Sequence, residues 1–133
     1  MSEDPPFEPG HSDVGVDEIG EVVRFDVVGH GDGLHVLHVV GEIDTLTAPL
    51  LRSRLVEELK DVTLLVVDMT DVTFLGSAGL AALVAARDDA AAGSVTLRLV
   101  PGSRIVARAL EATGLLSLFD IAVGVPQALE IAG

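Results

Sequence analysis

The sequence predicts an α/β protein with a single mixed, mainly parallel β-sheet that begins with an antiparallel hairpin. Three patterns support this fold class. Strand-like and helix-like segments alternate in the order ββαβαβαβα, with about four helices. Residues 64–69 form a nearly continuous apolar run, as expected of a central strand covered on both faces. A glycine-rich turn at residues 29–33 separates the first two strand-like segments.

The chain divides into an acidic N-terminal tail and one domain. Residues 1–20 contain three prolines, three glycines and six acidic side chains, but no lysine or arginine. Such a segment cannot bury enough apolar surface to offset its ordering entropy, so we expect it to be disordered. Residues 21–133 are long enough for one globular domain with its own core.

Two strands and a helix are predicted to open the domain. Residues 22–28 alternate imperfectly between apolar and polar side chains, and residues 34–40 form the second strand after the turn. Thr47 is expected to cap the following helix, with Pro49 in its first turn, where a missing N–H costs little. Leucines spaced four residues apart give this helix one apolar stripe, namely Leu51, Leu55 and Leu59.

The rest of the domain alternates strands and helices. The strand at 64–69 precedes a helix over residues 77–91, which carries apolar side chains at helical spacing, and residues 95–100 form a fourth strand. We expect Ser103 to cap a third helix and Gly114 to be the left-handed residue after it. A short strand and a last helical turn are then predicted, at residues 116–121 and 126–131.

Composition limits the classes of partner. The formal net charge is −13, so phosphate backbones and anionic lipids would repel the chain, and we expect no direct nucleic acid partner and no membrane. The chain has no cysteine, which rules out disulfides, thiolate catalysis and cysteine-based zinc sites. No secretion signal or membrane-spanning run is recognisable, and a cytoplasmic protein is expected.

The segment Gly76-Ser77-Ala78-Gly79 is similar to a hydrolase nucleophile elbow, but its spacing is wrong. The elbow reads G-x-S-x-G, whereas this chain reads G-S-x-G. All four histidines, at positions 11, 30, 35 and 38, precede Ser77, whereas the hydrolase order places the base after the nucleophile. His35 and His38 are three residues apart on a strand, so they point to opposite faces and cannot easily share a metal ion. We therefore expect no enzymatic activity.

Acidic side chains gather around the expected strand ends. Asp68 and Asp71 flank the end of the apolar strand, and Glu42 and Asp44 follow an earlier strand. Such a rim is typical of magnesium sites in phosphoryl transfer. No lysine sits at a following strand end, however, so we do not expect catalysis there.

Ser77 has two interpretations on physical grounds. A serine at the start of a helix commonly caps it by accepting a hydrogen bond from a backbone N–H. Its neighbours Gly76, Ala78 and Gly79 are small, however, and leave the hydroxyl open. A phosphate on that hydroxyl would gain from the helix dipole and from free N–H groups. Capping and phosphorylation both stay open at this point.

Two segments, taken in their order along the chain, are more specific and indicate a protein family. The first is Gly41-Glu42-Ile43-Asp44, followed by a helix that begins near Thr47-Ala48. The second is Asp71-Val72-Thr73-Phe74-Leu75-Gly76-Ser77-Ala78-Gly79-Leu80. With residues 66–69, 104–115 and 118–119, they resemble the STAS-domain family of anti-sigma factor antagonists. The resemblance extends from about Val22 to Ile131.

The resemblance implies a partner-switching regulator of transcription. The unphosphorylated protein would bind an anti-sigma factor, a serine kinase of the histidine-kinase-like ATPase type, and so release a sigma factor. That kinase would phosphorylate Ser77, and a metal-dependent serine phosphatase would reverse the modification. No cofactor, metal ion or catalytic residue is implied. The partner-binding face would comprise Asp44, Thr45, Leu75, Gly76, Ser77, Ala78 and Gly79.

One position departs from the family pattern. Many members have aspartate directly before the serine, whereas this chain has Gly76. The change removes a carboxylate that would orient the hydroxyl or contact the kinase.

An alternative function on the same fold is a STAS scaffold or small-ligand-sensing module in a stress-signalling complex.

Overall fold

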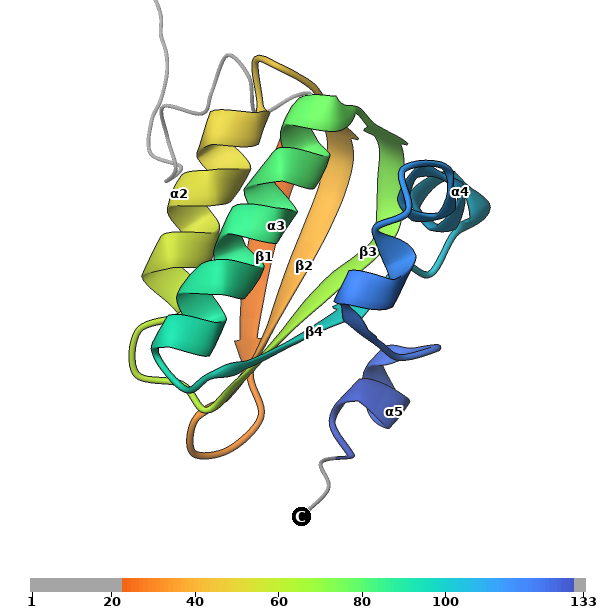
Figure 1. The fold of residues 1–133 in the computed structure, drawn as a ribbon. Coiled ribbons are helices and arrows are strands. Elements are labelled where there is room, and N and C mark those ends of the chain that lie inside the picture. Colours follow the sequence, from red (N-terminus) through yellow and green to blue (C-terminus); the bar gives the residue numbers. More distant parts are fainter. Residues whose placement is uncertain (1–22, 131–133) are drawn as a thin grey trace, which may run out of the picture.

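The computed structural model describes residues 23–130, which form one five-stranded sheet (Figure 1). The expected disordered tail, residues 1–20, lies outside the described residues, as do Val22 and Ile131. β1 and β2 pair antiparallel and the remaining neighbours pair parallel, which confirms the predicted sheet. The strands lie in sequence order across the sheet: β1 (Val23–Gly29), β2 (Leu34–Ile43), β3 (Leu64–Leu75), β4 (Thr96–Val100) and β5 (Asp120–Ile121).

Within residues 23–130, four α-helices and one 3-10 turn connect and follow the strands. α2 and α3 lie side by side over one face of the sheet, and α5 lies on the other side near β4 (Figure 1). None of these helices, within residues 23–130, is long and apolar enough to cross a membrane. Their bounds are α2 (Ala48–Glu58), α3 (Ser77–Ala92), α4 (Arg104–Ala112), η1 (Leu116–Leu118) and α5 (Val125–Ala128).

The core lies mainly between the sheet and the pair α2–α3. Leu51 and Leu55 are fully buried and Leu59 is partly buried, as their spacing predicts. A smaller cluster fills the opposite face of the sheet under α5, and it contains Val36, Leu64, Val66, Val100 and Ala128. β3 therefore contributes apolar side chains to both faces, which confirms its prediction as a central strand.

β3 is longer than its apolar run predicts. The expected end was Met69, but the strand continues to Leu75. β3 carries one extra residue at each of two register shifts against β2, and the strands stay paired, so that Ile43 still lies opposite Leu75. Backbone pairing with a neighbouring strand stabilises this extension, although most of its side chains are exposed. As a result, only Gly76 separates β3 from α3.

The end of the chain also differs from expectation. The strand predicted over residues 116–121 is split into the turn η1 and the two-residue strand β5. Only Asp120 and Ile121 find partners, opposite Arg98 and Leu99 of the short strand β4. β5 is therefore confined to the two residues that pair with β4.

Candidate functional site

The site lies where β3 passes into α3. Gly76 is the single residue between Leu75 and the helix, and its backbone is extended, with φ −92° and ψ −178°. The N–H of Gly76 donates to the carbonyl of Ile43 at 2.9 Å, which ties the junction to the end of β2. Ser77 is therefore presented beside the ends of two neighbouring parallel strands.

The Ser77 hydroxyl does not cap the helix. Gly76 occupies the N-cap position of α3, and Ser77 is the first helical residue. A side chain accepts from the first free N–H groups of a helix when it sits at the N-cap position, which here has no side chain. The capping interpretation of Ser77 is therefore wrong. The residue is exposed at the start of a 16-residue helix.

Asp44 and Thr47 hold the adjoining loop between β2 and α2. Asp44 Oδ1 accepts hydrogen bonds from the N–H groups of Leu46 and Thr47, at 3.0 and 3.1 Å. The buried Thr47 hydroxyl donates to the carbonyl of Glu42 at 2.8 Å and accepts from the N–H of Asp44 at 2.9 Å. This network fixes the loop without using any group of Ser77.

The predicted N-cap position of Thr47 is confirmed, but the capping hydrogen bond expected of its side chain is not formed. Thr47 occupies the N-cap position, but its backbone is helical and its side chain makes no cap bond. Its hydroxyl is committed to the end of β2 instead. The Asp44 carboxylate accepts hydrogen bonds from the free N–H groups of this turn, as short polar side chains commonly do.

The two loops meet around a shallow pocket of about 240 Å³. Five of the seven residues predicted for the partner-binding face line it, and the sixth lining residue is Phe74. The predicted five are Asp44, Thr45, Gly76, Ser77 and Ala78. The other two, Leu75 and Gly79, are buried, so they do not line the pocket but help to position the junction between β3 and α3.

Two exposed apolar side chains belong to the same region and are missing from the sequence prediction. Phe74 is 50% exposed on β3, and Leu46 is 65% exposed in the loop after Thr45. Leu46 lies between two threonines and Phe74 directly precedes the apolar Leu75, so neither position predicts exposure, because apolar residues are more often buried than exposed. Only the structure shows that Phe74 lines the same pocket as Ser77.

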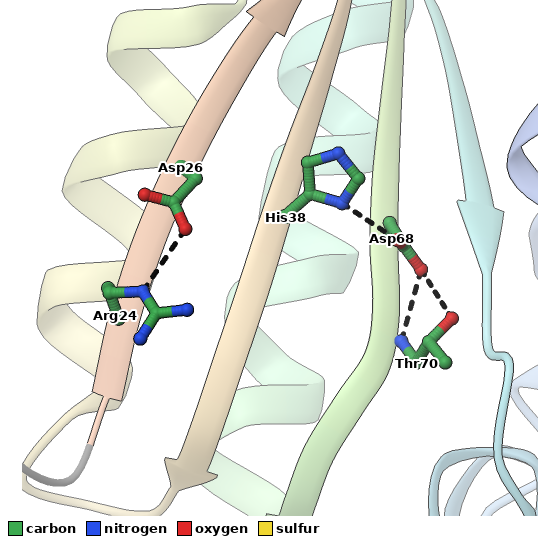
Figure 2. Close-up of polar contacts among 5 residues, drawn as sticks. All are labelled: Arg24, Asp26, His38, Asp68 and Thr70. Atoms are coloured by element: carbon green, nitrogen blue, oxygen red, sulfur yellow. Dashed lines mark hydrogen bonds and ion pairs between the residues drawn. The ribbon is translucent and has the colours of Figure 1, made fainter.

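The acidic side chains do not form one rim. Asp68 lies within β3 and not at its end, and its Oδ2 is 2.8 Å from His38 Nδ1 (Figure 2). Its Oδ1 accepts hydrogen bonds from the N–H and the hydroxyl of Thr70 (Figure 2). The expected grouping of Asp68 with Asp71 at a strand end is wrong, because β3 continues beyond both.

The histidines of β2 lie on opposite faces, as predicted. His35 Nδ1 is 3.3 Å from Glu58 Oε1 of α2, whereas His38 contacts Asp68 on the other face. Within residues 23–130, no three histidine, aspartate or glutamate side chains are placed to hold a metal ion. The polar contacts of these histidines are pairwise.

The Asp44 carboxylate has a pKa below its usual value of 3.8, mainly because the backbone N–H of Thr47 donates to it. The folded state thus binds this proton more weakly than the unfolded state. The resulting stabilisation of the folded state is fully present above the pKa that Asp44 has in the unfolded chain. It is lost as pH falls through the lower pKa that Asp44 has in the folded protein.

Replacing Asp44 with asparagine tests this electrostatic contribution. Asparagine offers an oxygen for the same two hydrogen bonds but does not titrate in this range. Between about pH 5 and about pH 3, we expect the melting temperature of the wild type to fall more than that of Asp44→Asn. Thermal unfolding followed by circular dichroism measures both slopes. Parallel slopes would show that Asp44 does not couple folding to pH.

Comparisons with known proteins give a consistent result. Residues 25–128 match the family model described as the STAS domain. The anti-sigma-F factor antagonist RsfB of Mycobacterium tuberculosis is 35% identical over 95 residues, which cover 71% of this chain and 77% of RsfB. A crystal structure of an anti-sigma factor antagonist from Mycobacterium paratuberculosis is similar with a TM-score of 0.71 and 31% identity, covering 82% of this chain and 92% of that one. The Bacillus antagonist SpoIIAA shares the fold, with a TM-score of 0.63 and 18% identity over 75% of this chain and 89% of its own.

Proposed function

The chain belongs to the STAS-domain family of anti-sigma factor antagonists, which are regulatory proteins and not enzymes, and we propose that it is a phosphorylation-controlled member. Unphosphorylated, it binds an anti-sigma factor that is a serine kinase of the histidine-kinase-like ATPase type, and a sigma factor is released. Phosphorylation of Ser77 ends this binding, and a serine phosphatase restores it. The observation that carries the proposal is the exposed Ser77 hydroxyl, which does not cap its helix.

Ser77 suits a kinase substrate because its hydroxyl is accessible. Gly76 has no side chain and Ala78 has a single methyl group, so neither neighbour shields it. The first N–H groups of a helix have no acceptor within the helix, and the helix dipole favours negative charge at this end. A phosphate on Ser77 would therefore be tolerated by the fold.

The same phosphate would prevent association. It adds about −1.5 to −2 charges at pH 7, next to Asp44 in an already acidic chain. A partner surface fitted to a neutral hydroxyl would then enclose a charge without a counter-ion, which is strongly unfavourable. The switch needs no change of fold, since the modified atom lies on the surface itself.

A hydrolase function lacks its base. Within the described residues, the pocket that Ser77 lines contains no histidine. His35 and His38 are engaged with carboxylates elsewhere on the sheet.

Because sigma factors act on RNA polymerase, the proposed function places the chain in the cytoplasm.

Variants of Ser77 test the proposal. We expect Ser77→Ala to capture an ATPase-type anti-sigma factor from host lysate, identified by mass spectrometry, and Ser77→Asp to lose it. With the purified partner, calorimetry should show at least about 100-fold weaker binding for Ser77→Asp. Ser117→Asp, which adds the same charge at an exposed position in η1, is the matched control and should bind as the wild type does.

Each result of this experiment has a distinct meaning. Equal binding by Ser77→Ala and Ser77→Asp would identify a binding module without a switch at Ser77. Failure of every variant to bind such an ATPase would favour the scaffold or ligand-sensing function. Radiolabelled ATP with the purified partner adds a direct test, because label should enter the wild type and not Ser77→Ala.

A further inference from the structure

Phe74 is exposed in a way that the fold does not require. It is the penultimate residue of β3, lies opposite Glu42 of β2, and is 50% exposed. Of the other two phenylalanines in the described part of the chain, Phe25 is partly buried and Phe119 is buried. A half-exposed ring contributes less to folding than a buried one, because the gain scales with the apolar area removed from water.

The position of the ring depends on Gly76. A Cβ atom on residue 76 would lie 3.1 Å from Phe74 Cε2 and 3.4 Å from Cζ. Gly76 has a negative φ of −92°, so the backbone itself would accept any residue there. Glycine at position 76 therefore leaves room for the Phe74 ring. The ring forms one wall of the pocket beside Ser77.

The surroundings of the ring indicate the chemistry of what it meets. Leu46, 65% exposed, is a second apolar side chain in the β2–α2 loop, whose residues Asp44 and Thr45 line the same pocket as Phe74. Glu42, directly across the strand pair, is exposed and adds a negative charge at the border. Apolar side chains that gather beside polar ones mark binding surfaces, and aromatic anchors carry much of the affinity in such interfaces.

We propose that Phe74, placed over Gly76, is an apolar anchor that contributes to binding of the anti-sigma factor. The partner surface would offer an apolar socket for the ring, bordered by a basic side chain facing Glu42. This inference rests on the proposed function and adds an aromatic residue to the partner-binding face.

Truncation of the ring tests the anchor. Each purified ATPase-type anti-sigma factor of the host is titrated with the wild-type chain, and the one that binds is used for the variants. We expect Phe74→Ala to weaken binding about 30-fold, with Phe74→Leu in between. Val28→Ala is the matched control, because Val28 is an exposed apolar residue on β1, and its affinity should equal that of the wild type. Melting curves verify that each variant is folded.

A double-mutant cycle tests the role of Gly76. Gly76→Ala should move the ring and weaken binding about fivefold in the wild-type background. In the Phe74→Ala background, the same substitution should have no further effect, since no ring is left to move. An equal loss in both backgrounds would overturn this role of Gly76.

Glu42 tests the basic border of the socket. Glu42→Gln should slow association and flatten its dependence on salt, as expected when a charge at the edge of an interface is removed. An unchanged salt dependence would overturn the charge complement.

The two proposals fail in different ways. If Phe74→Ala binds as tightly as the wild type while Ser77→Asp does not bind, the anchor is refuted and the phosphorylation switch stands. If the wild type binds none of the anti-sigma factors, both are refuted. Tighter self-association of the wild type than of Phe74→Ala in ultracentrifugation, without anti-sigma binding, would assign the ring to a second copy of this chain instead.

Discussion

Gly79→Val is expected to lower the free energy of unfolding by about 3 kcal/mol and the melting temperature by about 10 °C. A Cβ atom at Gly79 would lie 2.5 Å from Ile43 Cγ2 and 2.7 Å from Leu75 Cδ1, and both side chains are buried. Valine adds two further methyl groups to this contact. The helix would have to move away from the strand ends that present Ser77. Thermal and urea denaturation measure the loss.

Ala81→Val is the matched control for this prediction. Ala81 lies on the same helix and is exposed, so valine there loses only helix propensity, about 0.5 kcal/mol. The loss of stability of Gly79→Ala should lie between those of the two valine variants. Its methyl group raises helix propensity, but it already comes too close to Ile43. If Gly79→Val melted like Ala81→Val, α3 would not pack closely against the end of β2.

Gly102→Ala is expected to cost about 3 to 4 kcal/mol for two combined reasons. Gly102 has φ +70°, in the left-handed region that L-residues disfavour. A Cβ atom there would also overlap Thr70, with its Cα only 2.7 Å away. Backbone cannot move aside as a flexible side chain can, so α4 would have to shift relative to β3. Urea denaturation of the variant measures the change.

Gly114→Ala separates the two reasons. Gly114 has a similar φ of +74°, but a Cβ atom there would have no neighbour within 4 Å. Its substitution should cost only the conformational term, about 1 kcal/mol. Equal losses at Gly102 and Gly114 would show that the close approach to Thr70 contributes nothing.

Local signals in the sequence predicted several features of the fold correctly. The Ser103 hydroxyl accepts a hydrogen bond from the N–H of Val106 and caps α4, as expected. Gly114 is left-handed directly after that helix region, and the turn at residues 29–33 joins the antiparallel pair β1–β2. Each of these features depends on residues that are close in sequence, so the local pattern contains the information needed.

The errors share one cause, which is competition from a distant partner. Pairing with β2 extends β3 from Met69 to Leu75. The hydroxyl of Thr47 bonds to the end of β2 instead of its own helix. Gly76, directly after the extended β3, takes the N-cap position of α3, so of the two interpretations left open for Ser77 the capping one is wrong. In each case a long-range contact was stronger than the local preference.

The sequence by itself determined the order of elements, the buried stripe of α2, the central position of β3 and the family through the segments around Asp44 and Ser77. Only the tertiary structure decided that Ser77 is free of capping, that Leu75 and Gly79 are buried, and that Phe74 is exposed beside the pocket. The physical reason is that periodicity and capping act over a few residues along one segment. Exposure and hydrogen-bond partners at the site depend on where two strands, far apart in sequence, end side by side.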